Sequence, residues 1–296
     1  MKAIGSIFII LILILAGVFW FVNRELIAFP EISLETANTD EIKAPDKDFD
    51  GWSFAVVGDL EGPTTITDKL LDQISQENIE FLVQLGDVVD ANADVAKKQS
   101  NMEAMQEALE QLPVPVYHVP GNNDLIYDEN LEIRTAALYQ EVINPELYST
   151  IEHNNARIFL LDNSYRRYGF PDEELTWLKQ ELATNSSPYT FLFFHRPIGV
   201  PGEDIFGDDE TPFSREQNTK FRELLSGYSV NLILNGHLHT TLQYTLDQAP
   251  VIITGGGGGI PQAIFGGEDS AFYHYYLVHV PSDGYTPIDT QLVPLN

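Results

Sequence analysis

The chain has 296 residues and a strongly acidic composition, with 44 aspartates and glutamates against 16 lysines and arginines and a net charge of −28. This length predicts one domain of catalytic size with an N-terminal appendage. A surface of this charge repels polyanions, so we do not expect polymeric nucleic acids among its partners. The absence of cysteine excludes disulfides, thiolate zinc sites and cysteine nucleophiles.

The N-terminal segment has the pattern of a membrane-spanning helix. Every residue from Ala3 to Val22 is uncharged, and at ~1.5 Å per residue this run reaches about 30 Å, enough to cross a bilayer core. Lys2 before the run and Arg24 after it, the latter offset by Glu25, favour a cytoplasmic N-terminus. We therefore expect residues 1–25 to be a signal anchor or transmembrane helix, with the catalytic domain exported to a periplasmic or extracellular space.

A cleaved signal peptide is the alternative interpretation, and it would make the protein secreted. No small-x-small cleavage site follows the apolar run, which favours the uncleaved anchor. Residues 26–50 follow as a predicted linker with Pro30 and Pro45. The linker would hold a catalytic domain, residues 51–296, away from the membrane.

Strands and helices alternate in the first part of this domain. The expected strands cover residues 53–57, 81–85, 114–119, 157–161 and 189–194. The expected helices cover residues 68–76, 93–112, 172–183 and 214–225, with Asp172 and Ser214 as candidate caps. Apolar residues at helical spacing predict the inner faces of two of these helices, namely Met102, Met105 and Leu109 in 93–112, and Leu175, Leu178 and Leu182 in 172–183. Beyond Thr240 only strands are expected, at residues 242–246, 251–254, 272–280 and 286–293. This order indicates two sheets packed face to face with helices outside.

Five polar segments each follow an apolar run, and together they indicate a two-metal centre. They are Gly58-Asp59-Leu60-Glu61, Gly86-Asp87-Val88-Val89-Asp90, Gly121-Asn122-Asn123-Asp124, His195-Arg196-Pro197 and Gly236-His237-Leu238-His239. Taken one at a time, the aspartates have the alternative interpretation of helix caps, the asparagine that of a turn residue and His195 that of a core histidine. Because the ends of parallel strands meet at one edge of a sheet, five such segments are expected to gather in one place.

With these motifs, the chain resembles the calcineurin-like metallophosphoesterases, in particular the phosphodiesterase and purple-acid-phosphatase-like branch. The resemblance covers roughly Trp52 to Val280. It includes Leu175-Thr176-Trp177-Leu178, which looks like a helix common in phosphodiesterase-like members, and the glycine run Thr254 to Gly259, which we interpret as close backbone packing beside the site. The resemblance implies an α/β fold, a four-layer α-β-β-α sandwich of two mixed sheets.

The resemblance also implies a set of metal ligands. Asp59 and His239 would bind the first metal, and Asp87 would bridge the two. Asn122, His195 and His237 would bind the second. His237 and His239 are two residues apart, so a regular strand would place both on one face, with Gly236 freeing the backbone to aim them separately.

The first departure from the family pattern is Glu61, which stands where Asp-x-His is usual. If Glu61 ligates the first metal, its charge favours oxygen-loving Mn²⁺ or iron, with Mg²⁺ also suitable and Zn²⁺ less so. It should also weaken the Lewis acidity of the pair. If Glu61 swings away, the first site would be weak or empty.

The second departure is Asn123, which stands where the family usually has a histidine before the third acid, here Asp124. That histidine is expected to protonate the leaving group or bind phosphate, and an asparagine can donate hydrogen bonds but cannot deliver a proton. The predicted catalytic residues are Asp87, Asn123, Asp124 and Arg196. Arg196 would pair with a phosphate oxygen; a surface arginine is the alternative.

The sequence therefore predicts a metal-dependent phosphoesterase in which hydroxide activated by two divalent metal ions attacks a phosphodiester or phosphomonoester. The expected partners are a small phosphorylated substrate and, through the N-terminal helix, the membrane. The sequence does not predict the oligomeric state. The alternative function is a catalytically impaired binding or scaffold module, because both departures fall at sensitive positions; a surface adhesion protein would leave the histidine pair unexplained.

Overall fold

The computed structural model describes residues 49–128, 133–165, 167–201, 212–263 and 271–296. The predicted transmembrane segment, residues 1–25, and the linker up to residue 48 lie outside the described residues. Among the described residues, no helix has the length and apolar character that crossing a membrane would take.

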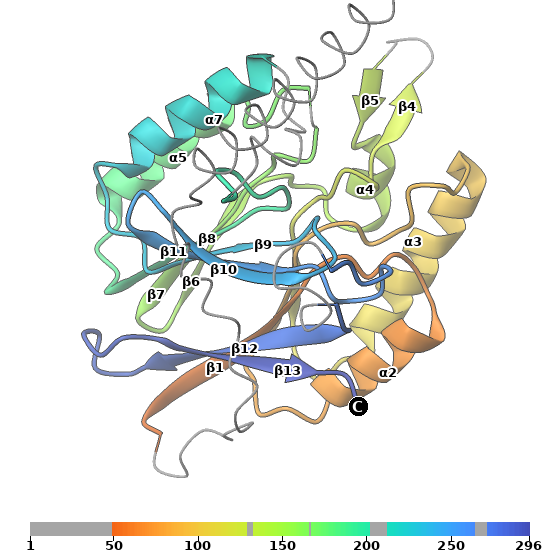
Figure 1. Ribbon diagram of the computed structural model, residues 1–296, viewed down its shortest axis with the longest axis horizontal. Coiled ribbons are helices and arrows are strands. Elements are labelled where there is room, and N and C mark those ends of the chain that lie inside the picture. The colour runs from red at the N-terminus through yellow and green to blue at the C-terminus, as the bar shows by residue number, and fades with distance from the viewer. Residues whose placement is uncertain (1–48, 129–132, 166, 202–211, 264–270) are drawn as a thin grey trace, which may run out of the picture. The chain divides into compact units, whose positions relative to one another are not determined.

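The first sheet contains the strands that carry the first three polar segments. Its order is β13-β12-β1-β2-β3 (Figure 1). The strands are β1 (Gly51–Val57), β2 (Leu82–Gln84), β3 (Val116–His118), β12 (His274–Pro281) and β13 (Asp289–Pro294). Strands β1, β2 and β3 run parallel, whereas β12 and β13 add antiparallel pairs. The carboxyl ends of β1, β2 and β3 therefore lie along one edge.

The second sheet has the order β10-β11-β9-β8-β7-β6. Its strands are β6 (Ser149–His153), β7 (Ala156–Leu160), β8 (Tyr189–Phe193), β9 (Leu232–Asn235), β10 (Thr241–Leu246) and β11 (Ala249–Thr254). The four central strands are parallel and the two edge strands antiparallel. Both sheets are mixed, as the resemblance implied.

Alternation along the strands explains why the sheets stack. In β1, Phe54 and Val56 join the core between the two sheets, while Ala55 and Val57 face the opposite way into a second core. A strand that is buried on both faces has an uninterrupted apolar sequence, and β1 has such a sequence from Phe54 to Val57. The Phe54 ring lies 5.8 Å from that of Phe191 in β8, so the two sheets meet through aromatic side chains.

Helices complete the four layers. Helices α2 (Thr65–Ile74), α3 (Val95–Glu110) and α4 (Ala137–Val142) cover the first sheet, and α5 (Asp172–Thr184) and α7 (Pro212–Leu225) cover the second (Figure 1). The predicted inner faces are confirmed, since the apolar residues expected on α3 and α5 are buried there. They are Met102, Met105 and Leu109 on α3, and Leu175, Leu178 and Leu182 on α5.

The two predicted helix caps are wrong. Asp172 is the first residue of α5, after Pro171, and its carboxylate instead accepts hydrogen bonds from Gln217 Nε2 and Lys220 Nζ of α7, each at 3.0 Å. Ser214 is buried inside α7, which begins at Pro212. Asp172 thus joins α5 to α7, a tertiary role that local capping patterns do not reveal.

Three elements were not predicted. They are the hairpin of β4 (Ile126–Asp128) and β5 (Ile133–Thr135), the short helix α4 and the edge strand β6. Each is short or only half-buried along its described residues, so the sequence carries little periodicity there. The hairpin follows directly after the asparagine segment, and α4 comes next in the chain (Figure 1).

Burial keeps His118, at the end of β3, in its neutral form. Burial lowers its pKa from 6.5 to about 4. Below pH 6.5 the unfolded chain binds a proton at this residue that the folded chain does not, so the stability contributed by neutral His118 is present above pH 6.5 and is lost as the pH falls toward 4.

We expect His118→Gln to reduce this loss. Relative to the parent chain, the variant should gain about 2 kcal/mol in free energy of unfolding as the pH is lowered from about 7.5 to about 5, at 1.36 kcal/mol per pH unit below 6.5. Urea denaturation of both chains at the two pH values measures this difference. An unchanged difference between the chains would contradict a neutral His118.

Candidate metal centre

The five polar segments meet where the carboxyl ends of the two sheets adjoin. Asp59 follows β1, Asp87 follows β2, Asn122 follows β3, His195 follows β8 and His237 follows β9. Backbone hydrogen bonds link neighbouring segments directly. Asp59 N donates to Gly86 O and Gly236 N to His195 O, both at 3.0 Å. The predicted convergence of these residues is therefore present in the structure.

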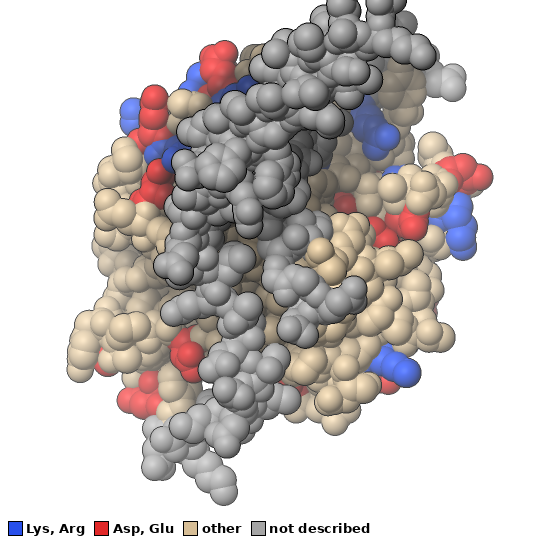
Figure 2. Space-filling view, in the orientation of Figure 1, with Lys and Arg blue, Asp and Glu red and all other residues tan. Residues whose placement is uncertain are grey.

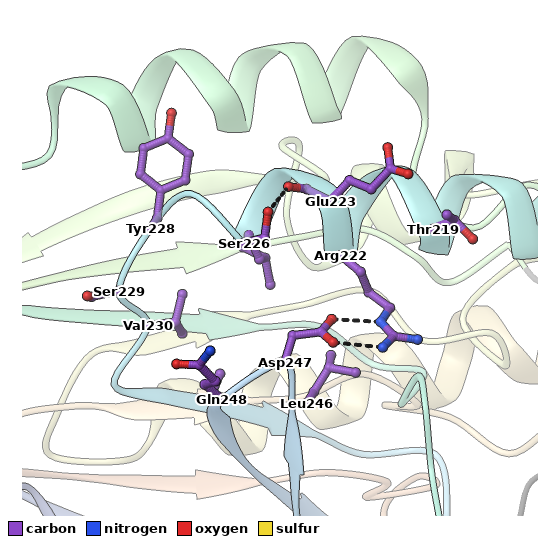
Figure 3. Close-up of a pocket in the computed structure, with 12 residues that line it drawn as sticks. Thr219, Arg222, Glu223, Ser226, Tyr228, Ser229, Val230, Leu246, Asp247 and Gln248 are labelled. Atoms are coloured by element: carbon purple, nitrogen blue, oxygen red, sulfur yellow. Dashed lines mark hydrogen bonds and ion pairs between the residues drawn. The ribbon is translucent and has the colours of Figure 1, made fainter.

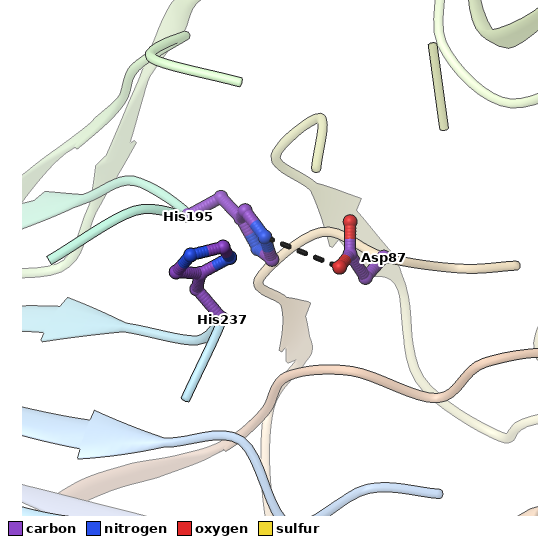
Figure 4. Close-up of side chains that lie close together, drawn as sticks. All are labelled: Asp87, His195 and His237. Atoms are coloured by element: carbon purple, nitrogen blue, oxygen red, sulfur yellow. Dashed lines mark ion pairs between the residues drawn. The ribbon is translucent and has the colours of Figure 1, made fainter. Parts of the chain in front are cut away.

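Asp87, His195 and His237 form a cluster that suits a metal ion. One ligand atom from each lies within 4.8 Å of the others, and all three side chains point to a common centre (Figure 4). His195 and Asp87 are buried, while His237 is half-buried. Carboxylate oxygen and imidazole nitrogen together suit Mn²⁺, iron or Zn²⁺.

The orientation of His195 is fixed by one hydrogen bond. Its Nδ1 lies 2.8 Å from Leu85 O, and because a carbonyl only accepts, Nδ1–H must be the donor. The other nitrogen, Nε2, faces Asn122 Oδ1 at 3.1 Å and Asp87 Oδ2 at 3.4 Å. Asn122 Nδ2 donates to Asn123 Oδ1, which places the Asn122 oxygen toward His195. Three acceptor atoms thus converge, an arrangement that requires either a proton or a cation between them.

The electrostatics of this pair support the same conclusion. Burial opposes ionisation of His195, but the Asp87 carboxylate beside it raises the pKa of the imidazole to about 9. Burial likewise acts to raise the pKa of Asp87, and His195 overrides it so that the pKa is lowered. The buried pair therefore holds positive charge on the imidazole next to negative charge on the carboxylate, and a divalent cation can take the place of that proton.

The predicted ligands of the first metal form a neighbouring set. His239 Nε2 lies 3.2 Å from Glu61 Oε1 and 3.6 Å from Asp59 Oδ1. Burial opposes ionisation of His239, yet Glu61 and Asp59 raise its pKa to about 9. Burial raises the pKa of Asp59 to about 7. Glu61 thus points toward His239 and does not swing away; metal ligation by Glu61 stays a prediction.

Four of the expected ligands have strained backbones. The φ angles are 60° at Asp59, 52° at Glu61, 53° at Asp87 and 71° at His237, a region that residues other than glycine seldom adopt. Such strain persists only where the surrounding structure enforces it, and it concentrates at functional sites. The sharp turns let each residue leave its strand end and aim its side chain sideways into the centre.

Gly236 has a different role from the one predicted. The freedom of backbone that was expected at Gly236 is instead used by His237, whose φ is positive. Gly236 is needed for space, since a Cβ there would lie 2.5 Å from Asp59 Oδ2. The two histidines follow the end of β9 and do not continue it, so they are not placed by a regular strand: His237 turns toward His195, whose ring centroid is 5.1 Å away, and His239 toward Glu61.

Asp124, the last residue of the asparagine segment, holds that segment and the turn at Asp87 together through hydrogen bonds. Its fully buried carboxylate accepts hydrogen bonds from four backbone N–H groups, those of Asp87, Val88, Val89 and Gly121, at 2.8–3.3 Å. Burial, with Asp87 nearby, raises the pKa of Asp124 to about 7. This geometry makes Asp124 a positioning residue for the turn that carries Asp87; the catalytic role predicted for it stays a prediction.

Asn123 and Asp87 are held together, with help from a lysine that the sequence did not single out. Asn123 N donates to Asp87 Oδ1 at 2.7 Å, and the buried Lys98 of α3 donates through Nζ to Asn123 O. The only sequence signal for Lys98 is a lysine on the inner face of an amphipathic helix. Asn163 is a second residue that was missed, and it fixes Arg196 by accepting from its N–H at 2.9 Å and donating to its carbonyl at 2.7 Å.

The glycine run packs closely beside the site, as predicted. A Cβ on Gly257 would lie 2.4 Å from Gly58 O, and one on Gly258 would lie 2.1 Å from Leu60 O. A Cβ on Gly259 would lie 2.4 Å from Cε1 of His239. Any larger residue would therefore displace either the first polar segment or the imidazole.

A cleft of about 720 Å³ opens beside Asn122 and His237, two of the three predicted ligands of the second metal (the second-metal set, with His195). Asn122, Asn123, Arg196 and His237 all line it. Arg196 Nη1 lies 3.4 Å from Asn122 Oδ1, so this arginine belongs to the site and is not an unrelated surface residue. A cleft of this volume suits a small ligand.

Comparison with known proteins identifies the class. Residues 53–241 match the family model described as calcineurin-like phosphoesterase. The chain therefore belongs to the calcineurin-like phosphoesterase family.

Two relatives and one solved structure illustrate the likeness. The chain is 30% identical over 162 residues to a probable glycerophosphodiester phosphodiesterase of Arcobacter nitrofigilis, covering 52% of this chain and 56% of that protein. It is 27% identical over 190 residues to a cAMP/cGMP dual specificity phosphodiesterase of Mycobacterium tuberculosis, covering 62% and 57%. The fold is similar to that of a purple acid phosphatase from yellow lupin, with TM-score 0.57, 15% identity and coverage of 82% and 53%. The chain thus spans little more than half the length of each of these two relatives.

The close contact at Gly121 gives a test of the centre. A Cβ there would lie 2.0 Å from Asp87 N and 2.2 Å from Asp87 Oδ1, so Gly121→Ala must displace the backbone that positions Asp87. We expect the variant to lose bound Mn²⁺, measured by elemental analysis after dialysis. Gly227→Ala is the matched control, because its Cβ would meet nothing closer than Leu224 O at 3.7 Å. Full metal content in Gly121→Ala would contradict the assigned centre.

Proposed function

We propose that the chain hydrolyses small phosphodiesters with two divalent cations held by the two residue sets. The observation that carries this proposal is the convergence on His195 Nε2, where an imidazole lone pair, an amide oxygen and a carboxylate oxygen face one another. Bound cations would supply Lewis acidity and lower the pKa of a coordinated water. The oxygen-rich first set favours Mn²⁺, iron or Mg²⁺ over Zn²⁺.

Asp87 is suited to join the two cation sites. Its carboxylate lies beside His195 in the second set, and its charge also acts on Asp59 in the first. One carboxylate oxygen, Oδ1, accepts from Asn123 N, so the side chain is held in one orientation. Asp87 thus provides a negative charge between the sets without needing to rearrange when substrate enters.

Arg196 and Asn122 are placed to orient a phosphate group at the floor of the cleft. Arg196 is held through its backbone by Asn163, and its guanidinium reaches the Asn122 side chain. A guanidinium binds phosphate oxygens with charge-assisted hydrogen bonds. The amide of Asn123 lines the same cleft and can donate to an oxygen of the substrate, but it has no proton to transfer to a leaving group.

The proposed substrate is small. The relatives named above act, by their names, on glycerophosphodiesters and cyclic nucleotides, and the cleft volume suits molecules of that size. On the face seen in Figure 2, the described acidic and basic side chains are scattered among uncharged ones, with no continuous basic area for a polymeric anion. With a net charge of −28, the chain would also repel long nucleic acids.

We also propose that the catalytic domain is exported and anchored by residues 1–25, because the uncharged run from Ala3 to Val22 is long enough to span a bilayer. A reporter enzyme that is active only outside the cytoplasm, fused after Asn296, tests this. Reporter activity in whole cells that remains with the membrane fraction supports the anchor; activity in the medium supports cleavage, and no activity contradicts export.

Activity is tested with the purified full-length chain and bis-p-nitrophenyl phosphate in the presence of Mn²⁺. We expect turnover that stops on chelation and falls at least about 100-fold in His237→Gln, because even supporting residues of metal sites typically contribute about 10–100-fold. The same substitution at His153 is the control, since that histidine bonds Glu80 and packs against Trp52, outside the centre. Metal binding without turnover on any phosphoester would instead favour the binding-module alternative.

The missing proton donor generates a second prediction. Asn123→His should raise kcat/KM for an alkyl phosphodiester such as glycerophosphoethanolamine by about 10-fold or more, since general acid catalysis contributes about 10²–10⁴-fold. The rate with bis-p-nitrophenyl phosphate should change little, because p-nitrophenolate leaves without protonation. Asn123→Gln controls for side-chain length. Equal gains from both variants, or no gain from histidine at any pH, would rule out a role for the proton.

A further inference from the structure

Three arginines line one cleft of a strongly acidic protein. Arg134 lies on β5, Arg167 lies in the loop after β7, and Arg196 follows β8. The whole chain has only 16 lysines and arginines against 44 acids, so three guanidinium groups from separate elements around one cleft concentrate positive charge where the rest of the surface is acidic. Such a cleft attracts small anions by focusing the field.

Arg196 belongs to the site already described, whereas Arg134 and Arg167 extend the positive charge beyond it. Arg134 lies on the Asn123 side. Burial chiefly lowers the pKa of Lys98, and the charge of Arg134 lowers it further, so Arg134 is near the ammonium group that holds the Asn123 carbonyl. Asn123 occupies the position from which the leaving group would be protonated in the family pattern. Arg134 therefore adds positive charge near Asn123.

Aromatic side chains border the same part of the cleft. Tyr165 and Phe213 line it, and Tyr168 bridges them, with ring centroids 4.8 Å from Tyr165 and 5.7 Å from Phe213. Phe213 is 45% exposed and Tyr168 is 39% exposed. Exposed aromatic faces next to guanidinium groups are suited to an anionic molecule that carries a planar ring, such as a nucleoside phosphate.

The chemistry of the leaving group links the arginines to Asn123. An alkoxide leaving group needs a proton that Asn123 cannot give, whereas a phosphate leaving group departs as a stable anion. Guanidinium groups stabilise the charge that develops on such an anion. Arginines in the same cleft as Asn123 are therefore suited, for a substrate with a phosphate leaving group, to serve in place of the missing histidine.

We propose that Arg134 and Arg167 form a second anion site in the cleft, and that the preferred substrate is an organic pyrophosphate whose departing phosphate they bind. The inference rests on the proposed phosphodiesterase function and specifies its substrate. Water oxygen bonds to the phosphorus above the metal sets, the bond from that phosphorus to the bridging oxygen breaks, and the electron pair leaves with the second phosphate. The products are two phosphomonoesters, and the protons of water pass to solvent.

The test compares two substrates with the full-length chain and Mn²⁺. Both substrates carry planar rings, but diadenosine pyrophosphate carries two phosphates and bis-p-nitrophenyl phosphate only one. Arg134→Gln and Arg167→Gln should each lower kcat/KM for diadenosine pyrophosphate about 10-fold or more, as expected when a charge-assisted hydrogen bond is lost. Turnover of bis-p-nitrophenyl phosphate should stay within about twofold, because that substrate offers no second phosphate to these residues.

Arg222→Gln is the matched control. Arg222 pairs with Asp247 through two hydrogen bonds of 2.7 Å in a separate cleft of about 650 Å³ that shares no lining residue with the first (Figure 3). The Arg222→Gln substitution removes one positive charge, as the other two substitutions do, but outside the first cleft. Thermal melts of all three variants check that the fold is kept, which the exposure of Arg134 and Arg167 leads us to expect.

The outcomes separate this inference from the proposed function. Hydrolysis of bis-p-nitrophenyl phosphate without hydrolysis of diadenosine pyrophosphate overturns the substrate assignment and leaves the proposed function intact. Equal effects of the variants on both substrates, or no effect on diadenosine pyrophosphate, overturn the second anion site. Absence of metal-dependent turnover with both substrates overturns the proposed function and this inference together.

Discussion

The hydrogen bond from His195 Nδ1–H to Leu85 O is the constraint on which the centre depends. It joins the end of β8 in one sheet to the end of β2 in the other, so it can form only when the two sheets are stacked in this register. It also fixes the tautomer, leaving Nε2 to face Asn122 and Asp87. Folding and site formation are thus linked, because one bond both spans the sheets and aims the imidazole.

The centre gathers more negative charge than the fold alone can stabilise. Asp59, Asp87 and Asp124 are buried together, and burial raises the pKa of Asp59 and of Asp124 to about 7. The backbone supplies part of the compensation, through four N–H groups on Asp124 and one on Asp59 from His237. The cations that we propose for this centre would supply the rest, so that buried carboxylates costly for stability become compatible with the fold.

Charge is arranged differently at the cleft and over the rest of the chain. A net charge of −28 favours solubility and repels polymeric anions, yet the entrance above the second-metal set holds three arginines. The sequence departures at Glu61 and Asn123 fit this arrangement. Glu61 adds negative charge among the metal ligands, and Asn123 removes a proton donor on the side where the arginines lie. Under the proposals made above, the two departures favour electrostatic stabilisation of an anionic leaving group over general acid catalysis.

The sequence by itself determined the layers and the chemistry of the centre. Apolar runs predicted the strands, helical spacing predicted the inner faces of α3 and α5, and polar segments after apolar runs located the residues that gather at the sheet ends. These signals are local, so one chain suffices to recognise them.

Only the tertiary structure decided how those residues act. Asp172 and Ser214 look like caps in sequence, but Asp172 accepts hydrogen bonds from α7 and Ser214 is buried within α7. No local sequence pattern predicts the positive φ angles at Asp59, Asp87 and His237. The same holds for the four backbone hydrogen bonds to Asp124 and for the hydrogen bond from Lys98 to Asn123. Arg134 and Arg167 are ordinary surface residues until β5 and the loop after β7 bring them to one cleft. The physical reason is that strain, burial and charge proximity are properties of contacts between segments distant in sequence, and these exist only once the two sheets have stacked.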